Sequence, residues 1–170
     1  PVQVTEGFKT TLIDSGTERR VLVPTLLNGG NNFGPEWYGS VSFPVEDWIL
    51  GRGAVGYETN SGYQDLISID IGDEMRSVNG SVYIRIPFST QGVDLEQANS
   101  LILRMRYDDG FVAYLNGVEI ASRNAPNEVS WNSFALGPHD DSSAVVFQEV
   151  DVSSHIPRLR QVGNVLAIQG

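Results

Sequence analysis

The sequence predicts an all-β fold, an antiparallel β-sandwich of the jelly-roll type, and two observations lead to this prediction. Short runs with apolar residues at every second position recur along the chain, and clusters of Gly, Asn, Asp and Pro separate them. This pattern is typical of half-buried strands joined by turns. In addition, Asn116-Gly117 lies between two apolar runs, which is the strongest short-range hairpin signal because both residues tolerate a positive φ.

The clearest strands surround this Asn-Gly pair. Residues 101–107, 111–115 and 118–122 alternate and are rich in long apolar side chains. Asp108-Asp109-Gly110 and Asn116-Gly117 interrupt them. We therefore expect three strands joined by two tight turns.

Weaker patterns indicate the elements of the first half of the chain. Gly, Asn and Pro supply turns and deny regular structure to the segments between the runs. We expect strands at 8–13, 19–27, 41–48 and 66–71, a turn at 14–16, and loops at 28–40 and 51–62.

The run at 81–88 is a clearer strand, in which Val82, Ile84, Ile86 and Phe88 face one way and Tyr83 and Arg85 the other. Further along, we expect one helical turn at 94–98 capped by Asp94, a polar loop at 124–143, and strands at 144–152 and 164–169. Eight or nine short strands follow from these patterns.

Length and charge limit the classes of function. The 170 residues fit one domain, which we assign to residues 1–170. The net charge of −10 would repel phosphate groups, so we expect no nucleic-acid partner and no anionic membrane surface. No apolar run approaches the ~20 residues that a membrane span needs.

Absence of cysteine excludes a disulfide framework, a thiolate zinc site and a cysteine nucleophile. Together with the acidic, Asn- and Gly-rich composition, and with Lys9 as the only lysine, it favours a secreted, extracellular bacterial protein. The last predicted strand stops at Gly170, and we expect the domain to be truncated at its C-terminus.

The run from Tyr107 to Pro126 resembles the galactose-binding-like jelly-roll modules of large secreted bacterial proteins. Three further segments resemble motifs of this family, in the same order along the chain. Residues 48–57 carry a Trp-x-x-Gly and a Gly-Tyr motif, residues 83–88 match a Tyr-x-Arg-x-x-Phe strand, and residues 163–169 match the closing strand. The resemblance covers about residues 37–170 and implies a galactose-binding-domain-like fold. Such modules accompany glycoside hydrolases and other hydrolases, so the resemblance implies a non-catalytic, carbohydrate-binding-module-like accessory domain.

Catalytic patterns are weak in this chain. His139 and His155 are the only histidines, and neither has a second histidine at helical spacing. No Gly-x-Ser-x-Gly elbow occurs. Asp70, Asp73 and Glu74 are close in sequence but fit a strand end followed by a turn. We therefore expect the chain itself to be no enzyme.

Sugar binding needs flat aromatic faces for the C–H face of a pyranose and polar groups for its hydroxyls. Such residues occur in or beside the polar loops, where Asn31, Asn32 and Glu36 also offer polar contacts. The candidate ligand-binding residues are Trp37, Tyr38, Tyr63, Trp131 and Asn132. The alternative is that the tryptophans pack in the core or plug the end of the sandwich, and the sequence does not separate the two cases.

Asp108 and Asp109 also have two interpretations. In the first, they accept backbone N–H groups within the turn. In the second, they bind a structural Ca²⁺, and the pair resembles the adjacent aspartates that hold calcium in certain lectin-like domains. Two carboxylates are too few for the 6–8 oxygens of Ca²⁺, so backbone carbonyls or Asp140 and Asp141 would have to join them.

Three hypotheses follow. The first is a carbohydrate-binding accessory module of a secreted polysaccharide-degrading or surface protein, with a polysaccharide and the other domains of the parent chain as partners. The second is a structural or protein-contact spacer without sugar affinity. The third is a divergent glycoside hydrolase fragment. Exposed tryptophans favour the first hypothesis, buried ones the second, and two carboxylates about 5–10 Å apart in a groove the third.

Overall fold

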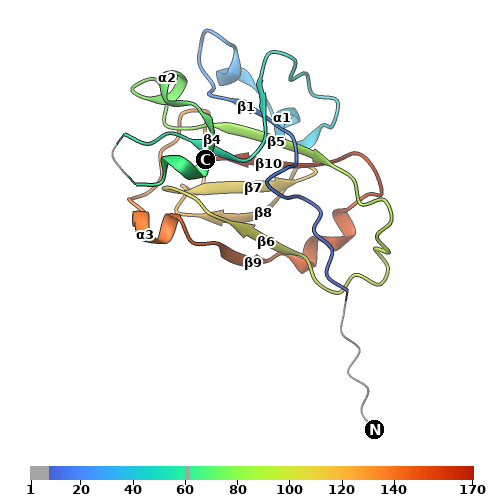
Figure 1. Cartoon of the computed structure of the whole chain (residues 1–170). Helices are drawn as coiled ribbons and strands as arrows, with labels where there is room; N and C mark the ends of the chain where they lie inside the picture. Colours follow the sequence, from blue (N-terminus) through green and yellow to red (C-terminus); the bar gives the residue numbers. More distant parts are fainter. Residues whose placement is uncertain (1–7, 60–61) are drawn as a thin grey trace.

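The protein is represented by a computed structural model that describes residues 8–59 and 62–170. There, a six-stranded antiparallel sheet in the order β2-β1-β5-β10-β7-β8 forms one layer of a sandwich (Figure 1). Two small sheets, β3-β4 and β6-β9, form the other layer. The predicted all-β sandwich is confirmed, although β3 and β4 run parallel to each other.

Strand and helix bounds show how short the elements are. The strands are β1 Arg19–Leu22, β2 Ile49–Gly51, β3 Ala54–Gly56, β4 Ile67–Asp70, β5 Tyr83–Phe88, β6 Ile102–Met105, β7 Phe111–Leu115, β8 Val118–Arg123, β9 Gln148–Asp151 and β10 Asn164–Gln169. The helical turns are η1 Gly30–Asn32, α1 Glu36–Gly39, η2 Gln64–Leu66, α2 Gly72–Met75, α3 Asp141–Ala144 and η3 Ser153–Arg158. Within the residues that the structure describes, no helix is both long and apolar enough to span a membrane.

The large sheet is buried on both faces. Strands β7 and β10 are buried along their whole length. On one face, Tyr83, Val112 and Tyr114 pack beneath α1 and the loops around it. On the other face, Ile86 and Phe111 pack against β6 and β9, and a separate cluster lies beneath β3 and β4. The predicted alternation of residues 82–88 is thereby confirmed.

The predicted Asn-Gly hairpin is confirmed as well. Asn116 and Gly117 have φ values of 50° and 90°, and they join β7 to β8 with Leu115 opposite Val118. The prediction of a second tight turn, at Asp108-Asp109-Gly110, is wrong, because β6 pairs with β9 and not with β7. Asp108-Asp109-Gly110 therefore carries the chain from one layer of the sandwich to the other.

Several predicted elements are wrong or too long. Residues 8–13 form no strand, and Phe8 is fully exposed. The strand predicted for 19–27 ends at Leu22, shortly before Pro24, which lacks a backbone N–H for the ladder. Residues 41–48 form no strand, and the expected loops contain η1, α1 and β3.

Two predictions in the second half also differ from the structure. No helix forms at 94–98, although Asp94 Oδ1 accepts hydrogen bonds from the backbone N–H groups of Glu96 and Gln97 as a cap would. The strand predicted at 144–152 is limited to β9, because residues 141–144 form α3. The strand at 66–71 is confirmed as β4, one residue shorter at each end.

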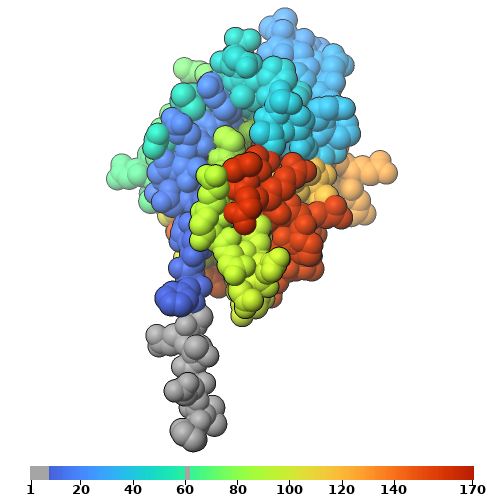
Figure 2. Space-filling view, turned by 90° about the vertical axis from the view of Figure 1, so that its right-hand side faces the viewer, coloured from blue at the N-terminus to red at the C-terminus, as the bar shows by residue number. Residues whose placement is uncertain are grey.

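Long loops close one side of the sandwich. In Figure 2, the segment after β5 lies beside the segment before β10. Ser89 and Thr90 donate side-chain hydrogen bonds to the backbone carbonyls of Gln161 and Arg160, respectively. These bonds hold together two loops that are far apart in the sequence.

Candidate functional site

The predicted site residues line two neighbouring hollows. Trp37, Tyr38 and Trp131 line a pocket of 330 Å³ on the α1 side of the large sheet. A cleft of 880 Å³ is lined by Tyr63, Trp131, Asn132, Asp108 and Asp109, among other residues. Trp131 borders both, so the structure brings the seven predicted residues into one region without placing them in one site.

Of the two interpretations of Trp37, burial is the one observed. Its side chain is 3% exposed, its ring stacks on Tyr83 with 3.9 Å between centroids, and Tyr38 meets it edge-on. This geometry leaves Trp37 without an open face. It acts as the wall of the small pocket.

Arg85, on strand β5 of the large sheet, holds α1 and therefore Trp37 in place. It is buried in β5 and donates hydrogen bonds to the backbone carbonyls of Trp37 and Ser40 at the end of α1. A cation at the C-terminal end of a helical turn satisfies carbonyls that have no partner within the helix. Burial lowers the pKa of Arg85 to about 10, so the guanidinium remains charged at neutral pH.

Trp131 is only partly buried, and no aromatic ring contact involves it within the described residues. It sits in a turn in which the Ser130 backbone N–H donates to Ser133 Oγ. Two amide side chains fix the turn: Gln169 donates to the carbonyl of Ser130, and Asn79 donates to that of Trp131. Trp131 packs against the core cluster around Trp37 and Tyr83, but it is the less buried tryptophan of the candidate set.

The small pocket is aromatic and uncharged. Besides Trp131, its walls include Tyr38, which stacks on Tyr114 at 4.2 Å, and Tyr83. Burial raises the pKa of Tyr83 and of Tyr114 to about 12, so both phenols keep their protons at neutral pH. The lining residues are Asn31, Phe33, Gly34, Pro35, Trp37, Tyr38, Tyr83, Tyr114, Val129, Ser130, Trp131 and Gln169.

Asn31 is the unusual polar residue of this pocket. Its side-chain oxygen Oδ1 is buried and has no hydrogen-bond partner in the part of the chain that the structure describes. A buried acceptor without a partner costs about 1–3 kcal/mol, and such groups call for an explanation. Because this oxygen has almost no accessible surface, a ligand hydroxyl in the pocket would become its donor only after the Asn31 side chain turns toward the pocket.

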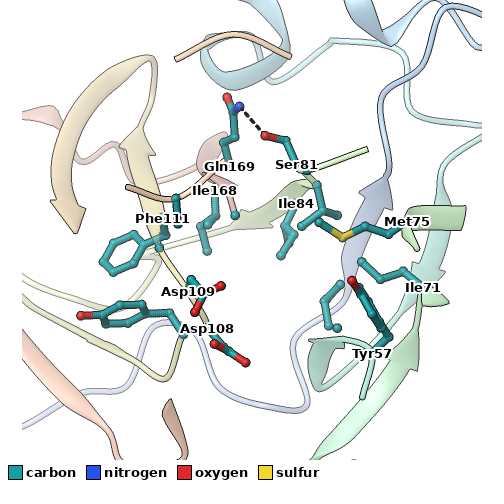
Figure 3. Close-up of a pocket in the computed structure, with 18 of the residues that line it drawn as sticks. Tyr57, Ile71, Met75, Ser81, Ile84, Asp108, Asp109, Phe111, Ile168 and Gln169 are labelled. Atoms are coloured by element: carbon teal, nitrogen blue, oxygen red, sulfur yellow. Dashed lines mark hydrogen bonds between the residues drawn. The ribbon is translucent and has the colours of Figure 1, made fainter. Parts of the chain in front are cut away.

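The larger cleft is apolar at its base and polar at its rim. Figure 3 shows Ile84, Phe111 and Ile168 at the base, on strands of the large sheet. Tyr57 and Met75 stand on one side, and Asp108 and Asp109 lie on the opposite side. Tyr63 and Asn132 also line the cleft.

The aspartates of the rim hold loops together. Asp108 accepts a hydrogen bond from the Tyr63 hydroxyl, and Asp109 Oδ1 accepts one from the His139 backbone N–H at 2.8 Å. Partial burial raises the pKa of Asp108, and the neighbouring Asp109 and Asp141 contribute, while the Tyr63 hydrogen bond lowers it. Burial, and then Asp108, raise the pKa of Tyr63.

A calcium site needs more oxygen ligands than this pair provides. Within residues 8–59 and 62–170, no group of three or more His, Cys, Asp or Glu side chains lies at metal-binding spacing. Asp140 and Asp141 therefore do not complete the ligand set with Asp108 and Asp109. The first interpretation placed the donors within the turn itself, whereas the observed donors, the Tyr63 hydroxyl and the His139 backbone N–H, lie in distant loops. Calcium binding stays a prediction.

The carboxyl pair also lacks the spacing of a glycosidase. Asp108 and Asp109 are neighbours in the chain, and Asp109 is close enough to help raise the pKa of Asp108, whereas glycosidases separate their two carboxyl groups by about 5–9.5 Å. Asp70 Oδ1 accepts the Gly72 backbone N–H between β4 and α2, as expected for a strand end and turn. His139 stacks on Tyr107 at 4.4 Å, and its Nδ1 lies 3.0 Å from the Tyr107 carbonyl oxygen.

Sequence reasoning identified Asn31 as a polar contact but missed Tyr83 and Tyr114. Both lie on strands, where alternating aromatic residues usually indicate a core face. Their spacing in the sequence gave no signal for a pocket, because residues of α1 and of the 130–133 turn complete it.

Comparison with known proteins gives distant structural matches. No family model matches the chain, and no curated protein sequence matches it. Among solved structures, a β-glucuronidase from an uncultured Clostridium species is 18% identical with a TM-score of 0.46, and the match covers 95% of this chain and 23% of that one. A β-glycosidase from Bacteroides vulgatus is 13% identical with a TM-score of 0.47, over 94% of this chain and 17% of that one. The chain thus spans less than a quarter of the length of these enzymes.

Proposed function

We propose that this domain is a non-catalytic carbohydrate-binding module, in which the small aromatic pocket takes one sugar ring of a polysaccharide. The observation that carries the proposal is the combination of the partly exposed Trp131 face with the unpartnered, buried Asn31 oxygen in one pocket. The pocket volume of 330 Å³ lies at the lower end of the ~300–1,000 Å³ typical of ligand sites.

The two features match the two halves of a sugar. The apolar C–H face of a pyranose packs on a flat aromatic ring, as on Trp131. A sugar hydroxyl loses its water on entering the pocket and regains a partner at Asn31 Oδ1. Since every lining residue is uncharged at neutral pH, a neutral sugar fits better than a uronic acid, whose carboxylate would lose water without a cation nearby.

The wider setting of the proposal comes from the sequence. The run from Tyr107 to Pro126 resembles modules of large secreted bacterial proteins. We therefore propose that the domain works outside the cell, as part of a polysaccharide-degrading or surface protein. Its partners would be a polysaccharide and the other domains of that protein.

A specific observation favours the alternative of a structural spacer. Trp37, the tryptophan nearest the Asn- and Gly-rich loop, is buried against Tyr83 and stabilises the fold whether or not a sugar binds. A spacer would retain this packing and show no affinity for any glycan.

Pull-down with insoluble polysaccharides, together with a glycan array, tests the proposal. We expect the wild type to be retained and Trp131→Ala to be lost from the bound fraction, with an unchanged far-ultraviolet circular dichroism spectrum and a cooperative unfolding transition in urea. Phe134→Ala is the matched control, because Phe134 is 73% exposed, lies three positions away and does not line the small pocket. Equal retention of both variants would refute the site, and no retention of the wild type would favour the spacer.

A further inference from the structure

The second layer of the sandwich is interrupted. In the described part of the chain, β3 pairs only with β4, and β6 pairs only with β9. Each of these strands therefore has one edge whose N–H and C=O groups take no part in a ladder. The cleft of 880 Å³ lies between these two halves of the layer.

The cleft is bordered by a strand edge rather than by a strand face. All three residues of β3, namely Ala54, Val55 and Gly56, line it, whereas β6 contributes its last residue, Met105, and the segment that follows the strand. Successive residues of a strand point to opposite faces of its sheet. Consecutive residues can line one cleft only if the backbone edge borders it.

The base of the cleft belongs to the sandwich core, in which Ile168 is buried and Ile84 is partly buried. The apolar cluster beneath β6 and β9 and the cluster beneath β3 and β4 are separate, and Ile84 packs against both. Ile84 and Ile168 line the cleft from the large sheet (Figure 3). Apolar side chains entering from above would join the two clusters and remove more apolar surface from water.

The rim gives the cleft a negative charge. Glu58, Asp108, Asp109 and Asp141 line it, whereas Arg106 is the one basic side chain among its described lining residues. The whole chain carries a net charge of −10. A ligand with positively charged groups would therefore complement this rim.

From these observations, we propose that the cleft accepts an extended peptide segment of a partner protein, which adds as a strand to the open edge of β3. Its alternate apolar residues face Ile84 and Ile168, and lysine or arginine residues reach Asp108 and Asp109. Main-chain hydrogen bonds to the open edge supply affinity, and the alternating side chains supply specificity. The cleft adjoins the proposed sugar pocket, because Trp131 lines both, but Asn31 and Tyr38 line the sugar pocket alone.

Synthetic peptides test this proposal. The probe is a fluorescein-labelled peptide of about four Lys-Val repeats, which matches ordinary strand lengths. We expect it to bind in a fluorescence anisotropy titration, and we expect the Glu-Val peptide of equal length to bind at least about tenfold more weakly, because like charges would meet at the rim. A Lys-Val peptide N-methylated at every second residue keeps its charge and side chains but lacks strand donors, and it should also bind at least about tenfold more weakly.

Variants of the protein locate the peptide. Asp108→Asn should weaken Lys-Val binding several-fold, whereas Asp73→Asn, an exposed acid outside the cleft, should leave it unchanged. Asn31→Leu should also leave it unchanged, even where glycan binding is lost. Equal binding of the N-methylated peptide, equal binding of the Glu-Val peptide, or no binding of the Lys-Val peptide would each overturn the proposal.

Discussion

The unpartnered oxygen of Asn31 leads to a prediction in which stability and binding change in opposite directions. The substitution is Asn31→Leu, which has a similar shape and removes the buried acceptor. If the pocket keeps this oxygen for a ligand, the unbound protein bears a cost of about 1–3 kcal/mol for leaving it without a partner. The leucine variant should recover part of that cost and lose affinity for the glycan.

The size of the effect follows from the domain's length. For a domain of 150–250 residues, each 1 kcal/mol shifts Tm by about 2–4 °C. We therefore expect Asn31→Leu to raise Tm by at least about 2 °C and to raise the free energy of unfolding in urea. Loss of the hydrogen bond to a sugar hydroxyl should weaken binding about tenfold, since 1.4 kcal/mol corresponds to that factor.

Asn28→Leu is the matched control for this substitution. Asn28 lies in the same loop, but its Oδ1 accepts hydrogen bonds from the backbone N–H groups of Thr25 and Gly30, and its Nδ2 donates to the Val23 carbonyl. Asn28→Leu should therefore lower the free energy of unfolding by at least about 2 kcal/mol. A destabilised Asn31→Leu protein, or one that binds the glycan as tightly as the wild type, would show that Asn31 has no ligand role.

Three further predictions concern stability. Arg85→Met should lower the free energy of unfolding in urea by about 2–4 kcal/mol, because the carbonyls of Trp37 and Ser40 lose charged donors. The control is Arg104→Met, which breaks an exposed ion pair with Glu149 at 3.1 Å and should cost less than about 1 kcal/mol. Similar losses for both variants would contradict the role of Arg85 in holding α1. Asp108→Asn should stabilise the protein at pH 7, because the raised pKa of Asp108 means that its ionised form is less favourable in the folded than in the unfolded state. This gain should vanish as the pH falls through that pKa to below the unfolded value, and a variant less stable than the wild type at pH 7 would contradict the reasoning. If Asp108 and Asp109 bind Ca²⁺ together with backbone carbonyls, added Ca²⁺ should raise Tm, and identical melting curves with Ca²⁺ and with a chelator would remove calcium from the account.

Elements governed by neighbouring residues could be predicted from the sequence. The β7–β8 hairpin follows from the positive φ values of Asn116 and Gly117, and the two faces of β5 follow from its alternating pattern. For both of these elements, the determining interaction involves backbone geometry or side-chain direction over a few residues. Asp108 and Asp109 were expected to accept hydrogen bonds within their own turn, but their donors, Tyr63 and His139, lie 45 and 30 residues away in the sequence, beyond the reach of a local pattern.

The fold class, the hairpin and the residue types available for a ligand follow from the order of the amino acids alone. The pairing of β6 with β9, the burial of Trp37 on Tyr83 and the pocket shared by Asn31 and Trp131 become visible only in the folded molecule. The physical reason is that the backbone ladder and aromatic packing are satisfied equally well by many distant partners. The choice among them depends on burial summed over the whole sandwich, which no local pattern encodes.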